Sequence, residues 1–324
     1  MDFNLNLDFG NEKKKPKVQA DHLYDLLIIG SGPAGLNAAL YGKRKGLDVA
    51  ILSTKVGGQV LDTSSVENYL GIPTATGESL VHEFISHVNT LDVPIIKDEN
   101  VKQIEKHDGQ FELLLGNGNK YFSKALIVAT GSKPRQLGVT GEETYRGRGV
   151  AYCAICDGPL FEGRDVIVAG GGNSAVEAAI DLSKIAKSVT LVHRSQFRAD
   201  QIVIDKLQAA SNVKILLETQ INEVVGDNLV TGVNVTDKKT NEQFFIPAEG
   251  VFVEIGYLPN NELVKSLVAL NDKGEIIVNA KNETSMAGLY AAGDVTDTPY
   301  KQIVVAASEG AKAALSANDY INHL

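Results

Sequence analysis

A glycine-rich unit occurs twice in this chain, 140 residues apart, and this repeat constrains the fold more than any other feature. In the first copy an apolar run at 26–29 leads into Gly30-Ser31-Gly32-Pro33-Ala34-Gly35. Apolar residues then recur at helical spacing as far as Gly46, and a second apolar run covers 49–52. A G-x-G-x-x-G turn between a strand and a helix lets the backbone and the helix N-terminus approach a pyrophosphate. We therefore expect a βαβ unit that binds a dinucleotide.

The second copy has the turn Gly170-Gly171-Gly172-Asn173-Ser174-Ala175, in which Ala175 is the permitted alternative to the third glycine. The mainly apolar segments 165–169 and 189–192 match the two strands of the first copy. The repeat predicts an α/β chain with two Rossmann-like, three-layer dinucleotide-binding domains.

Segments outside the two copies indicate how the domains are connected. A hairpin is expected at 111–122, followed by a buried strand at 125–129 that ends in Thr130-Gly131. A strand that ends in Gly293-Asp294, and a helix over 302–318, come after the second copy. We therefore expect the second domain to be inserted into a discontinuous first domain. The expected boundaries are an N-terminal extension at 1–21, a first domain at 22–136 and 258–324, and a second domain at 137–257.

The only two cysteines of the chain, Cys153 and Cys156, lie between the two glycine-rich turns. A Cys-x-x-Cys pair can form a disulfide that exchanges with other disulfides, because one thiol often has a lowered pKa. The same spacing is also half of a zinc site, but zinc needs further Cys or His ligands and no histidine lies at ligand spacing, so no metal is expected. Two inert buried thiols are a third reading, which the polar Asp157 beside them disfavours. We interpret the pair as a redox centre.

Composition excludes several classes of partner. A net charge of −9 disfavours nucleic acid or an anionic membrane, because both require clustered Lys and Arg. No apolar run approaches the roughly 20 residues of a membrane span, and the N-terminus lacks the apolar region of a signal peptide. Two cysteines in one motif leave no disulfide framework, which is typical of a reducing cytoplasm, and we expect a cytoplasmic protein.

The residues after the second strand of each copy distinguish the two nucleotide sites. An acid at this position holds a ribose 2′-hydroxyl, whereas a cation accommodates a 2′-phosphate. The first copy has Ser53 there, and its ribose must be held in another way, such as by amides near Gly58 and Gln59. The second copy has His193-Arg194, with Arg198 close behind; a solvated basic loop is the alternative reading. We assign FAD to the first copy and NADPH to the second.

Several motifs together resemble the low-molecular-weight thioredoxin reductases over nearly all of 24–320. Beyond the two turns they are 57–59, 66–69, 129–131, the sequence from Cys153 to Gly158, and 292–295. Other parts are more similar to the flavoprotein component of alkyl hydroperoxide reductase, at 156–161, 199–207 and 300–305. That relative carries thioredoxin-like domains ahead of its flavin domain, and only about twenty residues precede the first strand here. We therefore expect a stand-alone, homodimeric reductase that needs thioredoxin or a related redoxin.

The resemblance implies a site residue by residue. Nicotinamide passes hydride to the flavin, and the flavin reduces the Cys153–Cys156 disulfide. Cys156 would face the flavin, Cys153 would attack the partner's disulfide, and Asp157 would handle the proton. The implied FAD residues are Gly30, Ser31, Gly32, Pro33, Ala34, Gly35, Ser53, Gly58, Gln59, Asn68, Ala129, Thr130, Gly131, Gly293, Asp294, Gln302 and Ile303. The implied NADPH residues are Gly170, Gly172, Asn173, Ser174, Ala175, His193, Arg194, Arg198, Ile255 and Gly256.

One departure concerns the electron donor. NADPH-specific relatives carry His-Arg-Arg with a further Arg, and Ser195 stands here in place of the second Arg. Relatives that use NADH carry an acid at the position of His193. The chain matches neither pattern fully, and NADPH is favoured. The alternatives are an NADH-fed or ferredoxin-fed reductase of a peroxiredoxin or other redoxin, and a non-catalytic flavin and thiol redox sensor.

Overall fold

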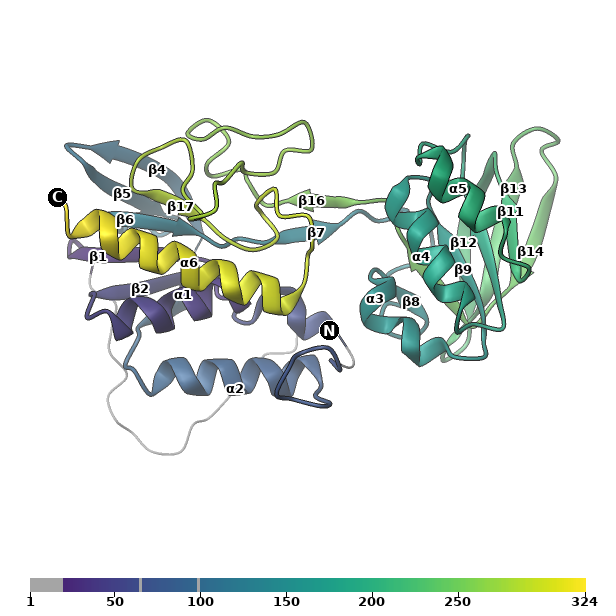
Figure 1. Cartoon of the computed structure of the whole chain (residues 1–324), viewed down its shortest axis with the longest axis horizontal. Helices are drawn as coiled ribbons and strands as arrows, with labels where there is room; N and C mark the ends of the chain where they lie inside the picture. The colour runs from purple at the N-terminus through teal and green to yellow at the C-terminus, as the bar shows by residue number, and fades with distance from the viewer. Residues whose placement is uncertain (1–19, 64–65, 98–99) are drawn as a thin grey trace. The chain divides into compact units, whose positions relative to one another are not determined.

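The computed structural model describes residues 20–63, 66–97 and 100–324 and divides into two compact units (Figure 1). The first unit contains the described residues up to Val60, together with Val81–Gly131 and Pro259–Leu324. The second contains Leu61–Leu80 and Ser132–Leu258. The expected N-terminal extension lies almost entirely outside the described residues.

A seven-stranded sheet forms the centre of the first unit. Its order is β3-β2-β1-β6-β5-β4, and β17 also pairs with β6. The strands β1, β2, β3, β6 and β17 pair in parallel, whereas β4, β5 and β6 form an antiparallel meander. The strands are β1 (Leu23–Ile29), β2 (Val49–Ser53), β3 (Ile95–Lys97), β4 (Val101–His107), β5 (Gln110–Leu115), β6 (Lys120–Val128) and β17 (Leu289–Ala291).

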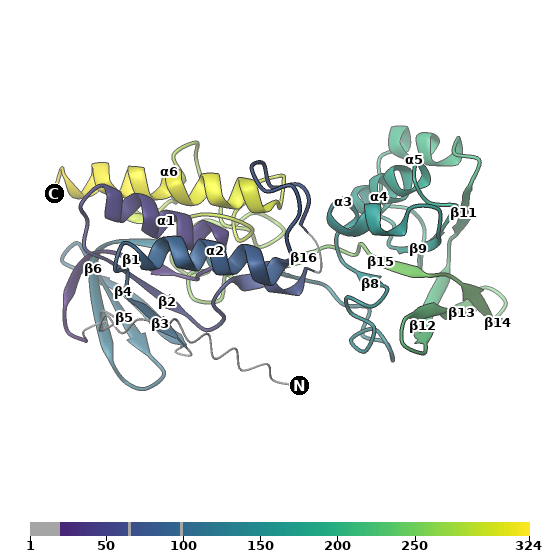
Figure 2. The ribbon, with the colours of Figure 1, turned by 90° about the horizontal axis from the view of Figure 1, so that it is seen from below.

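Three helices lie alongside this sheet: α1 (Pro33–Arg44), α2 (Gly77–Asn89) and α6 (Ile303–Ile321). Helix α1 lies between the other two (Figures 1 and 2). Gly310 lets α6 lie against α1, because a Cβ at Gly310 would stand only 2.0 Å from the carbonyl oxygen of Ala34. Leu26 and Leu27 are adjacent in β1 and fully buried. Leu26 packs near α1, and Leu27 belongs to the core on the opposite face.

The second unit has a parallel five-stranded sheet in the order β11-β10-β9-β15-β8. An antiparallel sheet β12-β13-β14 forms a further layer. The strands are β8 (Val150–Ala151), β9 (Asp165–Ala169), β10 (Ser188–Val192), β11 (Val213–Leu216), β12 (Thr219–Gly226), β13 (Val230–Asp237), β14 (Gln243–Pro247) and β15 (Gly250–Val253). The helices are α3 (Ala154–Asp157), α4 (Asn173–Ser183), α5 (Gln201–Gln208) and the 3₁₀ turn η2 (Gly158–Phe161).

The alternation of buried residues along β9 explains these three layers. Val166 and Val168 belong to the core shared with α4 and α5, whereas Ile167 and Ala169 belong to the core shared with β12 and β13. Successive strand residues point to opposite faces, and a strand buried on both faces is continuously apolar. The predicted fold of two Rossmann-like domains is confirmed, as are the expected hairpin, the strand before Thr130 and the C-terminal helix.

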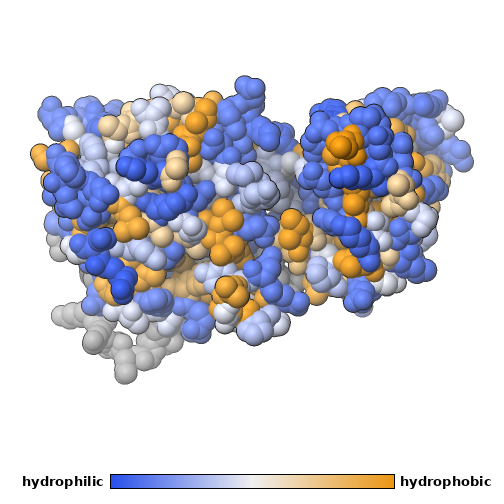
Figure 3. All heavy atoms as spheres, in the orientation of Figure 1, coloured by the Kyte–Doolittle hydropathy of each residue, from blue (hydrophilic) through white to orange (hydrophobic). Residues whose placement is uncertain are grey.

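The units are joined by two short strands, β7 (Ser132–Pro134) and β16 (Tyr257–Pro259), which pair with each other. Within the described ranges no helix is both long and apolar enough to cross a membrane. The face drawn in Figure 3 is mainly hydrophilic, with apolar side chains in small separate groups. The exposed apolar side chains include Ile155, directly before Cys156 in the sequence, and Leu160, four residues after it.

Candidate active site

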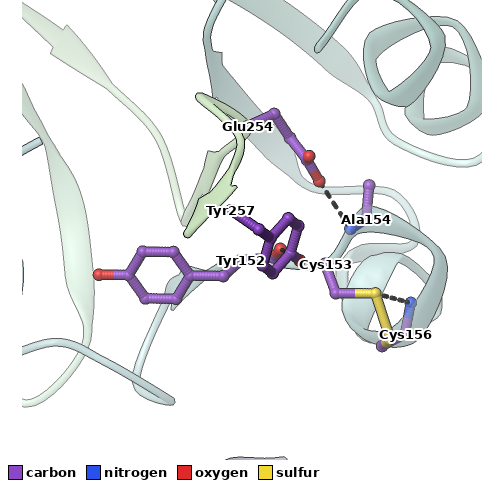
Figure 4. Close-up of a disulfide and its surroundings, with 6 residues drawn as sticks. All are labelled: Tyr152, Cys153, Ala154, Cys156, Glu254 and Tyr257. Atoms are coloured by element: carbon purple, nitrogen blue, oxygen red, sulfur yellow. Dashed lines mark hydrogen bonds between the residues drawn. A yellow bond between two sulfur atoms is a disulfide. The ribbon is translucent and has the colours of Figure 1, made fainter. Parts of the chain in front are cut away.

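Cys153 and Cys156 form a disulfide at the start of a short helix in the second unit (Figure 4). Their Cα atoms are 5.3 Å apart. Cys153 is the N-cap residue of α3, and its sulfur accepts the backbone N–H of Cys156 at 3.2 Å. A hydrogen bond to sulfur favours the thiolate once the disulfide is reduced. Both residues are partly exposed.

Asp157 ends α3 directly after Cys156. Burial raises the pKa of its carboxyl to about 6. The carboxylate does not cap the turn that follows, which removes the purely local reason for an acid here. A carboxyl that titrates near neutral pH beside two thiols is suited to giving and taking protons.

Asp157→Asn is expected to stabilise the second unit above pH 6 and to have no effect below about pH 4. The folded-state pKa lies above the unfolded value, so the protonated acid favours folding. That contribution is lost as pH rises through about 6. The amide avoids burying a charge, and the partial exposure of Asp157 limits the gain to about 1–2 kcal/mol. Thermal unfolding from pH 4 to 8 measures it, with Asp181→Asn as an exposed control. An equal gain at every pH would contradict this assignment.

The segment before the redox pair is held by a buried acid. Glu142 is 3% exposed and accepts the N–H groups of Leu137 and Gly138 at 2.9 and 2.8 Å. It also accepts the phenol of Tyr152 at 3.0 Å. The carbonyl oxygen of Tyr152 accepts the hydroxyl of Tyr257 at 2.6 Å. The residue before Cys153 is therefore fixed through both its side chain and its backbone.

The first glycine-rich turn, in the first unit, lies between β1 and α1. A Cβ at Gly30 would stand 2.2 Å from the carbonyl oxygen of Ala129, and one at Gly35 would stand 1.9 Å from that of Gly30. A Cβ at Gly32, by contrast, would meet no atom within 4 Å. No side chain caps α1, so its first N–H groups are available to an anion. The turn is closed on its inner side and open at the helix N-terminus, which fits a pyrophosphate.

Some of the other predicted FAD residues lie beside this turn, and Asn68 does not group with it. The Ser31 and Ser53 hydroxyls are 2.5 Å apart and buried, and Gly58 lies close to Gly32. The Thr130 nitrogen would stand 3.2 Å from a Cβ at Gly30, and the Thr130 hydroxyl donates to the Asn260 carbonyl oxygen at 2.7 Å. Asn68 lies in the segment 61–80, which groups with the second unit.

Asp294 follows Gly293 in the turn after β17, which ends at Ala291. Burial raises the pKa of its carboxyl to about 6, and Lys301 opposes that shift. No described residue donates a hydrogen bond to this carboxylate. Buried Glu309 instead holds the turn by accepting the Gly293 N–H at 2.7 Å. A carboxylate left without a donor here fits a ligand hydroxyl, such as one of an FAD ribityl chain. The predicted Gln302 is the N-cap of α6 and Ile303 its first residue.

The second glycine-rich turn lies between β9 and α4. A Cβ at Gly170 would stand 2.3 Å from the carbonyl oxygen of Glu254, whereas one at Gly172 would meet no atom within 4 Å. No side chain caps α4, so this turn also fits a pyrophosphate. Asn173, at the start of α4, exchanges two hydrogen bonds with Asp200, at 2.9 and 2.8 Å, which fix the loop after β10 over the turn.

The predicted cations near this turn differ in their surroundings. His193 is buried, with its ring against Gly171, and burial lowers its pKa, with Arg198 and Arg194 adding to the effect. Arg194 and Arg198 are exposed, and neither forms an ion pair with a described residue. The Arg198 N–H donates to the Gly171 carbonyl oxygen at 2.7 Å, which fixes its backbone beside the turn. The positive charge is therefore carried by the two arginines.

Comparison with known proteins identifies the family. Residues 24–310 match the pyridine nucleotide-disulphide oxidoreductase family. The chain belongs to this family. It is 45% identical to the alkyl hydroperoxide reductase F subunit of Pseudomonas putida over 95% of its own length and 60% of the relative's. It superposes on thioredoxin reductase from Streptococcus pyogenes with a TM-score of 0.88 and 39% identity, covering 93% of this chain and 99% of that one. Thioredoxin reductase from Giardia duodenalis gives 0.87 and 31%, covering 93% and 99%.

Membership implies that the chain binds FAD and a pyridine nucleotide, and the two open glycine-rich turns fit them. The chain spans about 60% of the length of the alkyl hydroperoxide reductase relatives it matches. Among the residues that the structure describes, no three His, Cys, Asp or Glu side chains form a cluster able to hold a metal ion.

The sequence analysis missed two acidic residues near the redox pair, Glu142 and Glu254. Glu254 belongs to no recognised motif, and its only signal is that an acid interrupts the apolar run 251–255. Glu142 lies in an ordinary polar loop and gave no signal. Both depend on contacts with Tyr152 or Ala154, which only the folded chain brings close.

Proposed function

We propose that this protein is an NADPH-dependent reductase of a redoxin disulfide, with thioredoxin as the favoured substrate. The observation that carries the proposal is the Cys153–Cys156 disulfide at the start of α3, in a chain that also holds two open nucleotide-binding turns. In the net reaction, NADPH and one proton from solvent reduce the redoxin disulfide to a dithiol and leave NADP⁺. When bound, NADPH supplies the electron pair and FAD relays it to the disulfide.

The residues of this chain position the groups and manage protons. The amides at the start of α1 and α4 would hold the two pyrophosphates, and Asp294 would accept a hydroxyl of FAD. Asp157 would give a proton to the Cys156 sulfur as the disulfide opens and take it back when the dithiol is oxidised again. Cys153 would attack the redoxin disulfide, with Cys156 releasing the mixed disulfide.

A second candidate differs in the partner. The alkyl hydroperoxide reductase relatives are 43–46% identical, compared with 31–39% for the two thioredoxin reductase structures above. This difference supports a redoxin that serves a peroxidase as the alternative substrate. An NADH-fed reaction belongs to the same alternative proposal. Homodimer formation stays a prediction.

Anaerobic titration decides the donor, and a turnover assay decides the partner. The holoprotein is mixed with NADPH or NADH without oxygen, and loss of flavin absorbance near 450 nm is followed. Thioredoxin and a peroxidase-linked redoxin are then supplied in turn. Flavin bleaching by NADPH followed by disulfide reduction supports the proposal. Bleaching by neither nucleotide would exclude it, and bleaching without reduction of any redoxin would favour the redox sensor.

Replacement of both Arg194 and Arg198 by alanine is expected to raise the KM for NADPH by at least about 100-fold and to change that for NADH less than twofold. Each charged hydrogen bond to a 2′-phosphate is worth about 1.5–3 kcal/mol, and NADH lacks this group. Initial rates of flavin reduction with each nucleotide measure the effect. Arg164→Ala is the matched control, because Arg164 pairs with Glu249 at 3.6 Å in the same unit. An equal rise in KM for both nucleotides would show that the arginines do not bind the 2′-phosphate.

A further inference from the structure

Glu254 connects the second glycine-rich turn to the redox pair. It directly follows β15, and its N–H donates to the Ala169 carbonyl oxygen at 2.9 Å, which continues the pairing with β9. Its own carbonyl oxygen lies where a Cβ on Gly170 would be only 2.3 Å away. The backbone of Glu254 is therefore fixed between a sheet strand and the turn, and only the side chain has freedom.

That side chain reaches α3. Its Oε1 atom accepts the Ala154 N–H at 3.2 Å (Figure 4). Ala154 is the first residue of α3, and its nitrogen is bonded to the carbonyl carbon of Cys153, the N-cap residue. The carboxylate thus lies one peptide unit from the carbon that carries the Cys153 side chain. No described residue other than Ala154 donates a hydrogen bond to it.

The charge of this carboxyl changes near neutral pH. Burial raises the pKa of Glu254 to about 7, and the Ala154 N–H lowers it by less. Neighbouring segments carry further ionisable groups: Asp157 on α3, the phenols of Tyr152 and Tyr257, and Arg135, whose side chain lies beside Gly256. None of these described groups contributes to the shift.

We propose that Glu254 is a positioning residue for the redox pair, and that its carboxylate controls the charge of the Cys153 sulfur in the reduced protein. A carboxylate held one peptide unit from the Cys153 Cα repels negative charge on that residue's sulfur and favours its protonated form. A neutral carboxyl leaves the thiolate stabilised by the Cys156 N–H. The inference deepens the proposed function, because it concerns how readily that same sulfur attacks a partner.

The test uses full-length holoprotein carrying Cys156→Ser, in which Cys153 is the only thiol. The rate of alkylation by iodoacetamide is measured from pH 5.5 to 10, with and without Glu254→Gln. Glutamine has nearly the same shape and still accepts the Ala154 N–H. We expect it to lower the midpoint of the alkylation profile by about one pH unit, a tenfold rise in thiolate near neutral pH. Glu249→Gln is the matched control: it removes one charge before β15 instead of after it, and should leave the midpoint unchanged.

An unchanged midpoint in Glu254→Gln, or an equal shift in Glu249→Gln, would overturn the proposal. Thiolate absorbance near 240 nm, referred to Cys153→Ser/Cys156→Ser, gives the same midpoint if the reagent cannot reach the sulfur. Circular dichroism checks that the variants fold. Neither readout needs nicotinamide or redoxin, so failed redoxin turnover with a shifted midpoint would reject the proposed function alone. Normal turnover with an unshifted midpoint would reject the role of Glu254 alone.

Discussion

Replacement of either Cys153 or Cys156 by serine is expected to lower the turnover of a redoxin by more than about a thousandfold. Each sulfur is required in every cycle, because the electron pair reaches the partner only through thiol–disulfide exchange between this dithiol and the partner's disulfide. The chain has no third cysteine to substitute. The double variant should be no worse than either single one, since the two residues act as a unit. Reduction of a redoxin is followed with a chromogenic disulfide, and reduction of the flavin by NADPH serves as the internal control and should persist.

The two single variants should differ in what they trap. In Cys156→Ser, Cys153 can attack a redoxin but nothing releases the product, so a mixed disulfide should accumulate on non-reducing gels. The Cys156 N–H still lies near the Cys153 sulfur, because a serine keeps the backbone donor. Cys153→Ser should trap little. Trapping only in Cys153→Ser would reverse the assigned roles, and full turnover in both variants would exclude the dithiol as the route for electrons.

The regular parts of the fold could be predicted because they follow from local rules. Gly30 and Gly170 each follow an apolar run of at least four residues and each precede a helix. The spacing of apolar residues and the glycine turn therefore predict the same strand–turn–helix unit. Because the unit repeats after 140 residues, the elements of the first copy predicted those of the second. Helix α2 was not predicted, although its apolar residues Leu80, Val81, Ile85 and Val88 recur at helical spacing. No glycine-rich turn precedes it to mark its start.

The site could be predicted only where a motif carries it. The redox pair and the two turns are contiguous in sequence, and their local geometry follows from residue type. Glu142, Glu254 and Glu309 act through contacts across 10, 100 and 16 residues. A buried acid without a motif resembles any surface acid until the fold shows its partners. The environment of His193 was hidden for the same reason, because its burial depends on Gly171.

Gly30→Ala is expected to yield a protein without bound flavin and to destabilise the first unit by more than about 3 kcal/mol. Two costs add. Gly30 has φ +106°, a conformation that residues with a Cβ rarely adopt. The new methyl would also stand 2.2 Å from the Ala129 carbonyl oxygen, and that atom belongs to a backbone fixed by the Ala129 N–H to Ile29 bond of 2.8 Å. The ratio of absorbance near 450 nm to that at 280 nm measures flavin content, and thermal unfolding measures stability.

Two matched variants separate the contributions to this effect. Gly109→Ala, in the turn between β4 and β5, has the same kind of strain at φ +83° but no atom within 4 Å of the new methyl. It should cost about 1 kcal/mol and keep the flavin. Gly32→Ala has neither positive φ nor a neighbour within 4 Å, so the apoprotein should unfold as the wild type does. Its methyl would, however, occupy the open side of the turn, and FAD affinity should fall about tenfold because a bound pyrophosphate needs that space.

The three variants together test whether the turn is built for a ligand or only for packing. If the turn served packing alone, Gly32→Ala would leave FAD affinity unchanged, as is expected for Gly109→Ala. No part of the chain occupies the space that the methyl at Gly32 would take. Weakened flavin binding in Gly32→Ala, without any loss of stability in the apoprotein, is the result that only a bound nucleotide explains. Unchanged FAD affinity in Gly32→Ala would remove FAD from this turn. A Gly30→Ala protein as stable as Gly109→Ala would mean that β6 can shift away from β1, and the close approach at Ala129 would then not explain why glycine stands there.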